Sequence, residues 1–369
     1  MRGPKRFGFS IAVAAFMAFA APAGAATRTV DDDHVQCPTA QYTSIQAAVQ
    51  SAAPGDTVQV CAGTYQETVT VDKDNLKLYS TPRQAAIIKA PMVIPTATGA
   101  IVDITANGVQ LDRFTITGPG GGPCNSLRYG VFVGDGDGAS ADVRDNRITE
   151  IRDNPFGGCQ NGVGARIGSQ FLGAVGHATL YGNYIDRYQK GGVVVDGDNT
   201  TATVQQNRTQ GAGPTGTIAQ NGIQVSRNAS ADVLQNIVLD HTYANPQIAS
   251  STGILLFQTG PGVDVDQNEG TRNDDNLGAY ETTGAVVDHN DFWRSTFYDG
   301  IYMNNDANGN TISNNYLRDN SQFDCDDAGN NVWQNDDGVT QNKPGLCNPN
   351  GGTKPGRQRD PNRHVQPFL

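Results

Sequence analysis

Residues 222–239, Gly-Ile-Gln-Val-Ser-Arg-Asn-Ala-Ser-Ala-Asp-Val-Leu-Gln-Asn-Ile-Val-Leu, contain one unit of a pattern that recurs along this chain. A Gly begins a short strand, a polar turn and a second strand follow, and an Asn begins a third. Only Asp, Asn and Gly turns separate the strands, so no crossover helix fits between them and we predict coiled parallel strands. The repeats begin at Gly130, Gly192, Gly222, Gly253 and Gly300, and their Asn positions are Asn146, Asn183, Asn207, Asn236, Asn290 and Asn315.

The spacing of these residues supports a repeat. The Gly-to-Asn distance is 15, 14 and 15 residues in the repeats that begin at Gly192, Gly222 and Gly300. Successive Asn positions from Asn268 to Asn315 lie 22 and 25 residues apart, a period typical of solenoids. An Asn at one point of successive coils can bond the next Asn and the turn backbone, so we predict a structural ladder. The chain then has roughly ten coils.

The N-terminal part of the chain supplies a cap for the first coil. Residues 43–53 have apolar positions at 45, 48, 49 and 52 on one helical face, and Pro54-Gly55 ends the pattern. Short strands follow directly. We predict a short capping helix that covers the open end of the solenoid.

A resemblance to a known superfamily rests on these residues. The runs Tyr42-Thr-Ser-Ile-Gln-Ala-Ala-Val, Pro54-Gly-Asp-Thr-Val-Gln-Val and Gly63-Thr-Tyr-Gln-Glu resemble the opening of pectin-lyase-like proteins, and residues 100–118 are similar to one full coil of that superfamily. The resemblance spans roughly residues 40–347 and implies an all-β chain folded as a right-handed parallel β-helix. Such proteins commonly act on acidic polysaccharides.

The chain divides into three segments. Residues 1–26 combine Arg2, Lys5 and Arg6 with an apolar run and a small-residue cleavage site, the pattern of a secretory signal peptide. We assign residues 27–347 to the β-helix and residues 348–369 to a flexible tail. We expect a secreted, monomeric protein without a membrane span. Removal of the three basic residues changes the formal charge from −11 to −14, which disfavours nucleic acid as a partner.

All six cysteines lie after the signal sequence, in a chain expected to be exported, so disulfides are favoured over a metal site. Six cysteines allow several pairings. We favour neighbours along the chain, since residues one coil apart lie on adjacent rungs about 4.8 Å apart, within disulfide reach. The predicted pairs are Cys37–Cys61, Cys124–Cys159 and Cys325–Cys347.

A candidate site follows from the outward positions of the strands that begin at each Gly. Alternation places Asp196 and Ser226 outward, with Arg166 on the preceding rung. We predict Arg166 as a catalytic base and Asp196 as the carboxylate that positions it. The alternative is an ordinary surface ion pair. Further along the same face we predict substrate-binding positions at Ser226, Phe257, Tyr302 and Asn304.

Calcium is the cofactor that the Asp-rich turns suggest, because Ca²⁺ takes six to eight oxygen ligands. Asp196 and Asp198 are candidate ligands. Other Asp-rich turns lie at 135–137, 273–276, 304–310 and 324–327. Asp-Gly and Asn-Gly pairs are also ordinary turn formers, so the alternative reading is purely structural.

The catalytic motifs of the superfamily are missing. The sequence has neither the paired Asp and His-Gly of polygalacturonases nor the Trp-Ile-Asp-His of pectate lyases, so no family catalytic residue transfers to a numbered position. Two hypotheses remain. The first is a secreted protein that binds an acidic polysaccharide or cell-surface glycan and cleaves it as a lyase or hydrolase. The second is a non-catalytic extracellular structural or adhesion module.

Overall fold

The repeated Gly strands form one ten-stranded parallel sheet, here called the first sheet, in a computed structural model that describes residue 3 and residues 24–349. Predictions for residues 1–26 and 348–369 fall almost entirely outside this range. The first sheet consists of β3 (Val69–Val71), β5 (Ala100–Ile104), β8 (Tyr129–Val133), β11 (Val163–Ile167), β14 (Gly191–Asp196), β17 (Asn221–Ser226), β20 (Thr252–Phe257), β23 (Asp275–Tyr280), β26 (Ile301–Met303) and β29 (Cys325–Asp327).

The second strand of each coil joins a second parallel sheet. Each of its strands pairs with the equivalent strand one coil later, as in Ala178↔Ala202 and Ala202↔Ala231. The second sheet consists of β1 (Thr27–Val30), β2 (Thr57–Gln66), β4 (Lys77–Lys89), β6 (Val109–Asp112), β9 (Ala139–Arg144), β12 (Gly176–Tyr181), β15 (Thr201–Gln205), β18 (Ser230–Leu234), β21 (Val263–Asp266), β24 (Val286–Asp288), β27 (Asn308–Ser313) and β30 (Asn330–Gln334).

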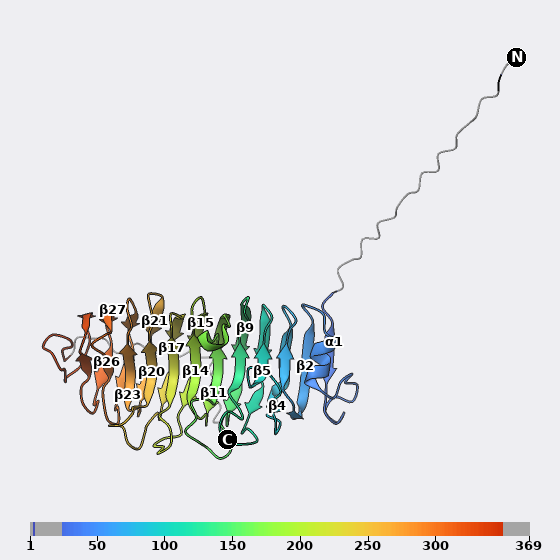
Figure 1. Ribbon diagram of the computed structural model, residues 1–369, viewed down its shortest axis with the longest axis horizontal. Coiled ribbons are helices and arrows are strands. Elements are labelled where there is room, and N and C mark those ends of the chain that lie inside the picture. The colour runs from blue at the N-terminus through green and yellow to red at the C-terminus, as the bar shows by residue number, and fades with distance from the viewer. Residues whose placement is uncertain (1–2, 4–23, 350–369) are drawn as a thin grey trace.

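The third strand of each coil forms a third parallel stack, which the long strand β4 connects to the second sheet. This stack consists of β7 (Thr115–Thr117), β10 (Arg147–Thr149), β13 (Tyr184–Asp186), β16 (Arg208–Gln210), β19 (Ile237–Leu239), β22 (Glu269–Thr271), β25 (Asp291–Trp293) and β28 (Tyr316–Arg318). The fold is the predicted right-handed parallel β-helix, and Figure 1 shows the coils side by side along the long axis.

The ends of the solenoid are covered as the sequence predicts. Helix α1 (Ile45–Ser51) lies over the first coil and buries Ile45, Ala48 and Val49. Ser44 caps the helix, and both carboxylate oxygens of Glu67 accept hydrogen bonds from its first turn. All three predicted disulfides are present: Cys37–Cys61 near the first coils, Cys124–Cys159 between two loops, and Cys325–Cys347 at the last coil.

The recurrence of Gly at the same position of several repeats has a steric cause. A Cβ atom at Gly192, Gly222 or Gly253 would lie 2.5–2.6 Å from the carbonyl oxygen at the same position of the next coil. Because this is closer than any Cβ can approach, only Gly lets neighbouring coils stack here without displacement. One further coil escaped the sequence analysis, since Asn276 of β23 stands where the two neighbouring coils have Gly253 and Gly300.

The Asn ladder is present and buried. From Asn146 to Asn315, each Nδ2 donates to the Oδ1 of the ladder residue in the next coil at 2.8–3.1 Å. The same Oδ1 atoms accept backbone N–H groups, so each amide joins two turns. The members are Asn146, Asn183, Asn207, Asn236, Asn268, Asn290, Asn315 and, at the end, Asp336.

Candidate functional site

The loops that lead into the strands of the first sheet are the longest in the solenoid and lie along its lower edge in Figure 1. Where the loops before β20, β26 and β29 meet the sheet, they enclose a pocket of about 590 Å³. Asp275, Asp299 and Asp326 line it, together with Tyr280, Tyr298 and Tyr302. We call this the aspartate pocket.

The register of the first sheet brings the three carboxyl groups together. Asp275 begins β23, Asp299 stands two residues before Ile301, and Leu277 pairs with Ile301 on the adjacent rung. The amide of Asp299 donates to Oδ1 of Asp275 at 3.2 Å. Asp326 lies one rung further along, paired with Tyr302. All three aspartates are less than a tenth exposed.

Burial and mutual repulsion raise the pKa of all three carboxyl groups. Burial raises the pKa of Asp275 to about 7. Burial, then the charges of Asp275 and Asp326, raise the pKa of Asp299 to about 8. The side chains of Asp299 and Asp326 hydrogen-bond to each other, and burial also raises the pKa of Asp326. A proton shared between two carboxyl groups in an open pocket is an arrangement suited to general acid–base chemistry.

Three tyrosines form the walls of the pocket. The rings of Tyr280 and Tyr302 meet edge to face with centroids 5.6 Å apart. The Tyr302 hydroxyl donates to Oδ1 of Asn304 at 2.9 Å, and the Tyr298 hydroxyl donates to the carbonyl of Pro246 at 3.0 Å. Burial raises the pKa of Tyr280 and of Tyr302, so both phenols stay protonated. The pocket thus offers aromatic surfaces beside its acids.

The predicted Arg166–Asp196 site lies elsewhere on the same sheet, under the 3₁₀ turn η1 (Gln170–Leu172). Arg166 pairs in register with Val194 rather than Asp196, and reaches Asp196 diagonally in an ion pair. Asp196 is fully buried, and its oxygens also accept from Arg227, the Ser226 hydroxyl and the Gln170 amide. Although burial alone would raise the pKa of Asp196, Arg166 and these donors hold it below its ordinary value. Catalysis by Arg166 stays a prediction.

The other predicted binding residues fall into different surroundings. Ser226 is buried against Asp196. Phe257 pairs with Tyr280 on the next rung and lines a second pocket beside the aspartate pocket. Tyr302 lines the aspartate pocket itself, and Oδ1 of Asn304 accepts a hydrogen bond from its hydroxyl group. The structure therefore divides the predicted row between a buried ion-pair cluster and an open groove.

The calcium prediction stays untested. Asp198 is exposed, and neighbouring donors engage both oxygens of Asp196. Within residues 24–349, clusters whose ligand atoms lie within 4.8 Å of one another include Asp31, Asp32 and Asp33, and Asp266, Asp288 and His289. Neither cluster includes Asp196, Asp198 or the three aspartates of the pocket.

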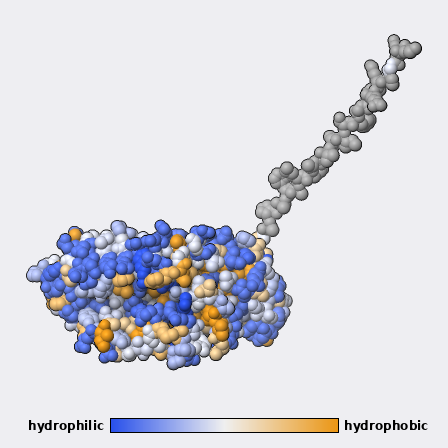
Figure 2. All heavy atoms as spheres, viewed as in Figure 1, coloured by the Kyte–Doolittle hydropathy of each residue, from blue (hydrophilic) through white to orange (hydrophobic). Residues whose placement is uncertain are grey.

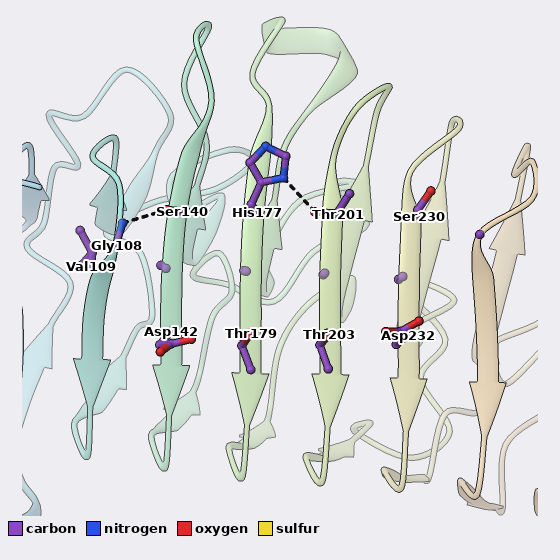
Figure 3. Close-up of a pocket in the computed structure, with 15 residues that line it drawn as sticks. Gly108, Val109, Ser140, Asp142, His177, Thr179, Thr201, Thr203, Ser230 and Asp232 are labelled. Atoms are coloured by element: carbon purple, nitrogen blue, oxygen red, sulfur yellow. Dashed lines mark hydrogen bonds between the residues drawn. The ribbon is translucent and has the colours of Figure 1, made fainter. Parts of the chain in front are cut away.

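A groove of about 530 Å³ crosses the outer face of the second sheet over β9, β12, β15 and β18 (Figure 3). Asp142, Thr179, Thr203 and Asp232 form one row across it, in register. The two carboxylates lie three rungs apart, roughly 14 Å, which is too far for a pair that acts on one bond. The spacing of the carboxylates thus favours the aspartate pocket over this groove as the candidate active site.

Sequence reasoning named Asp275 and Asp326 only as parts of Asp-rich turns, and did not name Asp299. The sequence does contain a pattern that relates Asp275 to Asp299. Asp299 directly precedes Gly300, and Asp275 directly precedes Asn276, which takes the equivalent place one coil earlier. The substitution of Asn for Gly at position 276 hid this equivalence.

Comparisons with known proteins agree with the fold. The chain is similar to a complex of XylC with xylose, at 11% identity and a TM-score of 0.55, over 80% of this chain and 70% of that one. It is also similar to native lacto-N-biosidase of glycoside hydrolase family 136 from Eubacterium ramulus, at 12% identity and a TM-score of 0.57, over 89% of this chain and 66% of that one. The chain thus spans about two thirds of the length of these structures.

No protein-family model and no curated protein matches the sequence. Within the described residues, no helix is long and apolar enough to span a membrane. At this level of identity the solved structures establish the architecture alone. Together with the three parallel stacks of strands, they identify the fold of the chain as a right-handed parallel β-helix.

Proposed function

We propose that this protein hydrolyses a glycosidic bond of a carbohydrate chain in the aspartate pocket. The observation that carries the proposal is a pocket walled by tyrosines in which Asp299 and Asp326 lie beside Asp275, whose Oδ1 accepts the Asp299 backbone amide. Glycoside hydrolysis needs a carboxylic acid that keeps its proton near neutral pH and a carboxylate that remains ionised. Three closely placed aspartates meet this need, because each charge raises the cost of ionising the next.

We assign the acid role to Asp299. As the C–O bond breaks, the Asp299 proton passes to the departing sugar oxygen, which leaves as an alcohol. Water adds its oxygen to the anomeric carbon, and its proton passes to an ionised carboxylate of the pocket, so that the second product is a hemiacetal. Asp275 acts as a positioning residue, because its Oδ1 holds the Asp299 backbone amide and its charge favours the protonated form of Asp299.

A carbohydrate substrate also fits the walls of the pocket. Tyr280, Tyr298 and Tyr302 present aromatic rings with polar tips, which suit the mixed apolar and hydroxylated faces of sugar rings. Two of the similar structures are a complex with xylose and a lacto-N-biosidase, both concerned with sugars. The three disulfides are typical of an oxidising compartment. We therefore propose an exported, monomeric enzyme that acts on extracellular glycans.

The test is an assay for new reducing ends on a panel of neutral and acidic oligosaccharides, with and without Ca²⁺. We expect wild-type protein to cleave at least one substrate, and Asp299→Asn to lower kcat by at least about 100-fold, since general acid catalysis contributes 10²–10⁴-fold. Asp142→Asn, in the groove of the second sheet, is the matched control and should keep full activity.

The same assay separates the competing hypotheses. Loss of activity in Arg166→Ala with full activity in Asp299→Asn, accompanied by unsaturated products, would move the chemistry to the Arg166–Asp196 site and make the protein a lyase. Absence of cleavage on every substrate, with no oligosaccharide binding, would favour a structural or adhesion module.

A further inference from the structure

A second pocket adjoins the aspartate pocket on the outer face of the first sheet. Its volume is about 450 Å³, and Ala249, Ser250 and Tyr280 line both pockets. The two pockets therefore form one groove along the solenoid axis. Phe257 and Leu255 contribute apolar surface to the second pocket, both from β20, the rung before β23. A chain held in the aspartate pocket can extend directly into this second pocket.

Lys190 is the charged residue among those that line the second pocket. Its ammonium group donates one hydrogen bond, to the carbonyl of Ala219 at 2.8 Å. An ammonium has three donors, and the described residues that line this pocket include no Asp or Glu that could pair with it. Burial lowers the pKa of Lys190 to about 8, so the group is mostly charged at neutral pH.

The charges along the groove are therefore polarised. Asp275, Asp299 and Asp326 line the aspartate pocket, and no Lys or Arg is among its described lining residues. The second pocket is lined by one basic residue, Lys190, and its described lining residues include no Asp or Glu. The ionised carboxylate that the proposed reaction requires in the aspartate pocket repels an anion, whereas a partly buried cation without a counter-ion attracts one. The groove thus suits a ligand that is neutral at one end and anionic at the other.

The sheet register gives the distance between the two ends. Lys190 directly precedes Gly191, and Gly191, Asn221, Thr252 and Asp275 pair in sequence on consecutive rungs. Three rungs separate Lys190 from Asp275, roughly 14 Å along the axis. A single sugar cannot contact both, whereas an oligosaccharide can.

We propose that Lys190 is a specificity-determining residue that binds an anionic group, a carboxylate or a sulfate ester, on a glycan whose neutral sugar occupies the aspartate pocket. This inference rests on the proposed function and narrows it, since it places the acidic group of the substrate away from the bond that is cleaved. It also predicts that a uniformly acidic polymer is a poor substrate, because one of its anions would face the three aspartates.

Binding measured by calorimetry tests this inference, with neutral oligosaccharides each paired with a form of equal length that carries one uronate, one sialate or one sulfate. The wild-type protein should bind the charged member of at least one pair about tenfold or more tightly, a typical effect of a charge-assisted hydrogen bond. Lys190→Met should abolish that preference and leave the affinity for the neutral member unchanged. Lys190→Arg, which keeps the charge, should retain most of it.

Controls separate a binding role from a structural one. Lys77→Met removes an exposed lysine of β4 and should leave every affinity unchanged. The preference should also weaken as salt concentration rises. Equal affinity for both members of every pair, or a preference that survives in Lys190→Met, would overturn the inference while leaving hydrolysis of neutral glycans intact. Failure of every oligosaccharide to bind would overturn it together with the proposed function.

Discussion

Asp299 combines two properties that together define its proposed role. It lies in a pocket that is open to a ligand, yet its carboxyl group is buried and adjoins two other carboxyl groups. The contrast with Asp196 is instructive, because both are buried aspartates of the same sheet. Two arginines hold the Asp196 charge in place, whereas Asp299 hydrogen-bonds to a second acid. Similar burial therefore produces opposite pKa shifts, and only one of them supplies a proton.

The pH dependence of activity follows from this shift. Asp299 must be protonated to act as the acid, and its pKa is raised to about 8. We expect kcat to fall as pH rises through about 8, where Asp299 loses its proton, and also to fall at acidic pH, where the carboxylate that accepts the water proton becomes protonated. Steady-state rates between pH 5 and pH 10 on a neutral oligosaccharide measure this. A loss of kcat with rising pH that is centred near pH 4, or a kcat that increases above pH 8, would contradict the assignment of Asp299 as the acid.

Asp336, at the end of the Asn ladder, gives a prediction about stability. Its Oδ1 accepts hydrogen bonds from the backbone amide and the Nδ2 of Asn315, whereas its Oδ2 is buried without a hydrogen-bond partner. Burial raises the pKa of Asp336 to about 7. The folded state thus keeps a proton that the unfolded chain releases above about pH 4. The free energy of unfolding should therefore decrease as pH rises from about 4 to about 7.

The Asp336→Asn variant removes this penalty. We expect it to raise the free energy of unfolding at pH 8 by about 2 kcal/mol or more, and by less at pH 5. Denaturant titrations at both pH values measure the difference. Asp198→Asn, at an exposed turn, is the control. A gain that does not depend on pH would show that the Asp336 carboxyl titrates normally in the folded protein.

At the scale of single elements, the central coils depend on a Gly that lets adjacent backbones approach. The sequence spacing identifies most of these elements, because Gly and Asn recur at steric and hydrogen-bonding positions that accept few other residues. Strand β23, in the middle of this series, departs from the pattern. Its Asn276 fills the Gly position, and its side chain joins a buried amide chain with Asn273 and Asn320. Because Asn276 takes the place of the Gly, the sequence of this coil does not show the repeat pattern. The aspartate pocket is built on this coil.

Gly222→Ala tests the steric argument. Its Cβ would lie 2.6 Å from the Gly253 carbonyl oxygen and would also overlap a methyl group of Val238. We expect a loss of about 3 kcal/mol in the free energy of unfolding, as in overpacked cores. Gly216→Ala is the matched control, because a Cβ there has no atom within 4 Å. Equal stability of the two variants would show that the coils separate at little cost.

At the scale of the whole molecule, the solenoid is a rigid scaffold with a largely hydrophilic exterior on the face that Figure 2 shows. Its architecture, its capping helix and its disulfides could be predicted because they follow from local patterns. The site could not, because it depends on which of many Asp-rich turns the coil register brings together. Asp275 and Asp299 are 24 residues apart in sequence, yet the Asp299 backbone amide donates a hydrogen bond to the Asp275 side chain.

The Cys325–Cys347 disulfide links the last coil to the site. Cys325 begins β29, and Asp326 follows it directly. Replacement of both cysteines by Ser should increase hydrogen exchange in β29 and β30, leave β8–β17 unchanged, and lower kcat. Hydrogen-exchange mass spectrometry with parallel assays measures both effects. Faster exchange in β29 with full activity would show that Asp326 is dispensable.

The central claim is that a glycan binds in the aspartate pocket with the scissile bond beside Asp299. The most direct measurement is a crystal structure of the Asp299→Asn variant with an oligosaccharide that the wild-type enzyme cleaves. The account predicts a sugar packed against Tyr280 and Tyr302, with a glycosidic oxygen within hydrogen-bonding distance of the side chain at position 299. A sugar bound instead over Arg166, or in the groove of the second sheet near His177, would contradict it.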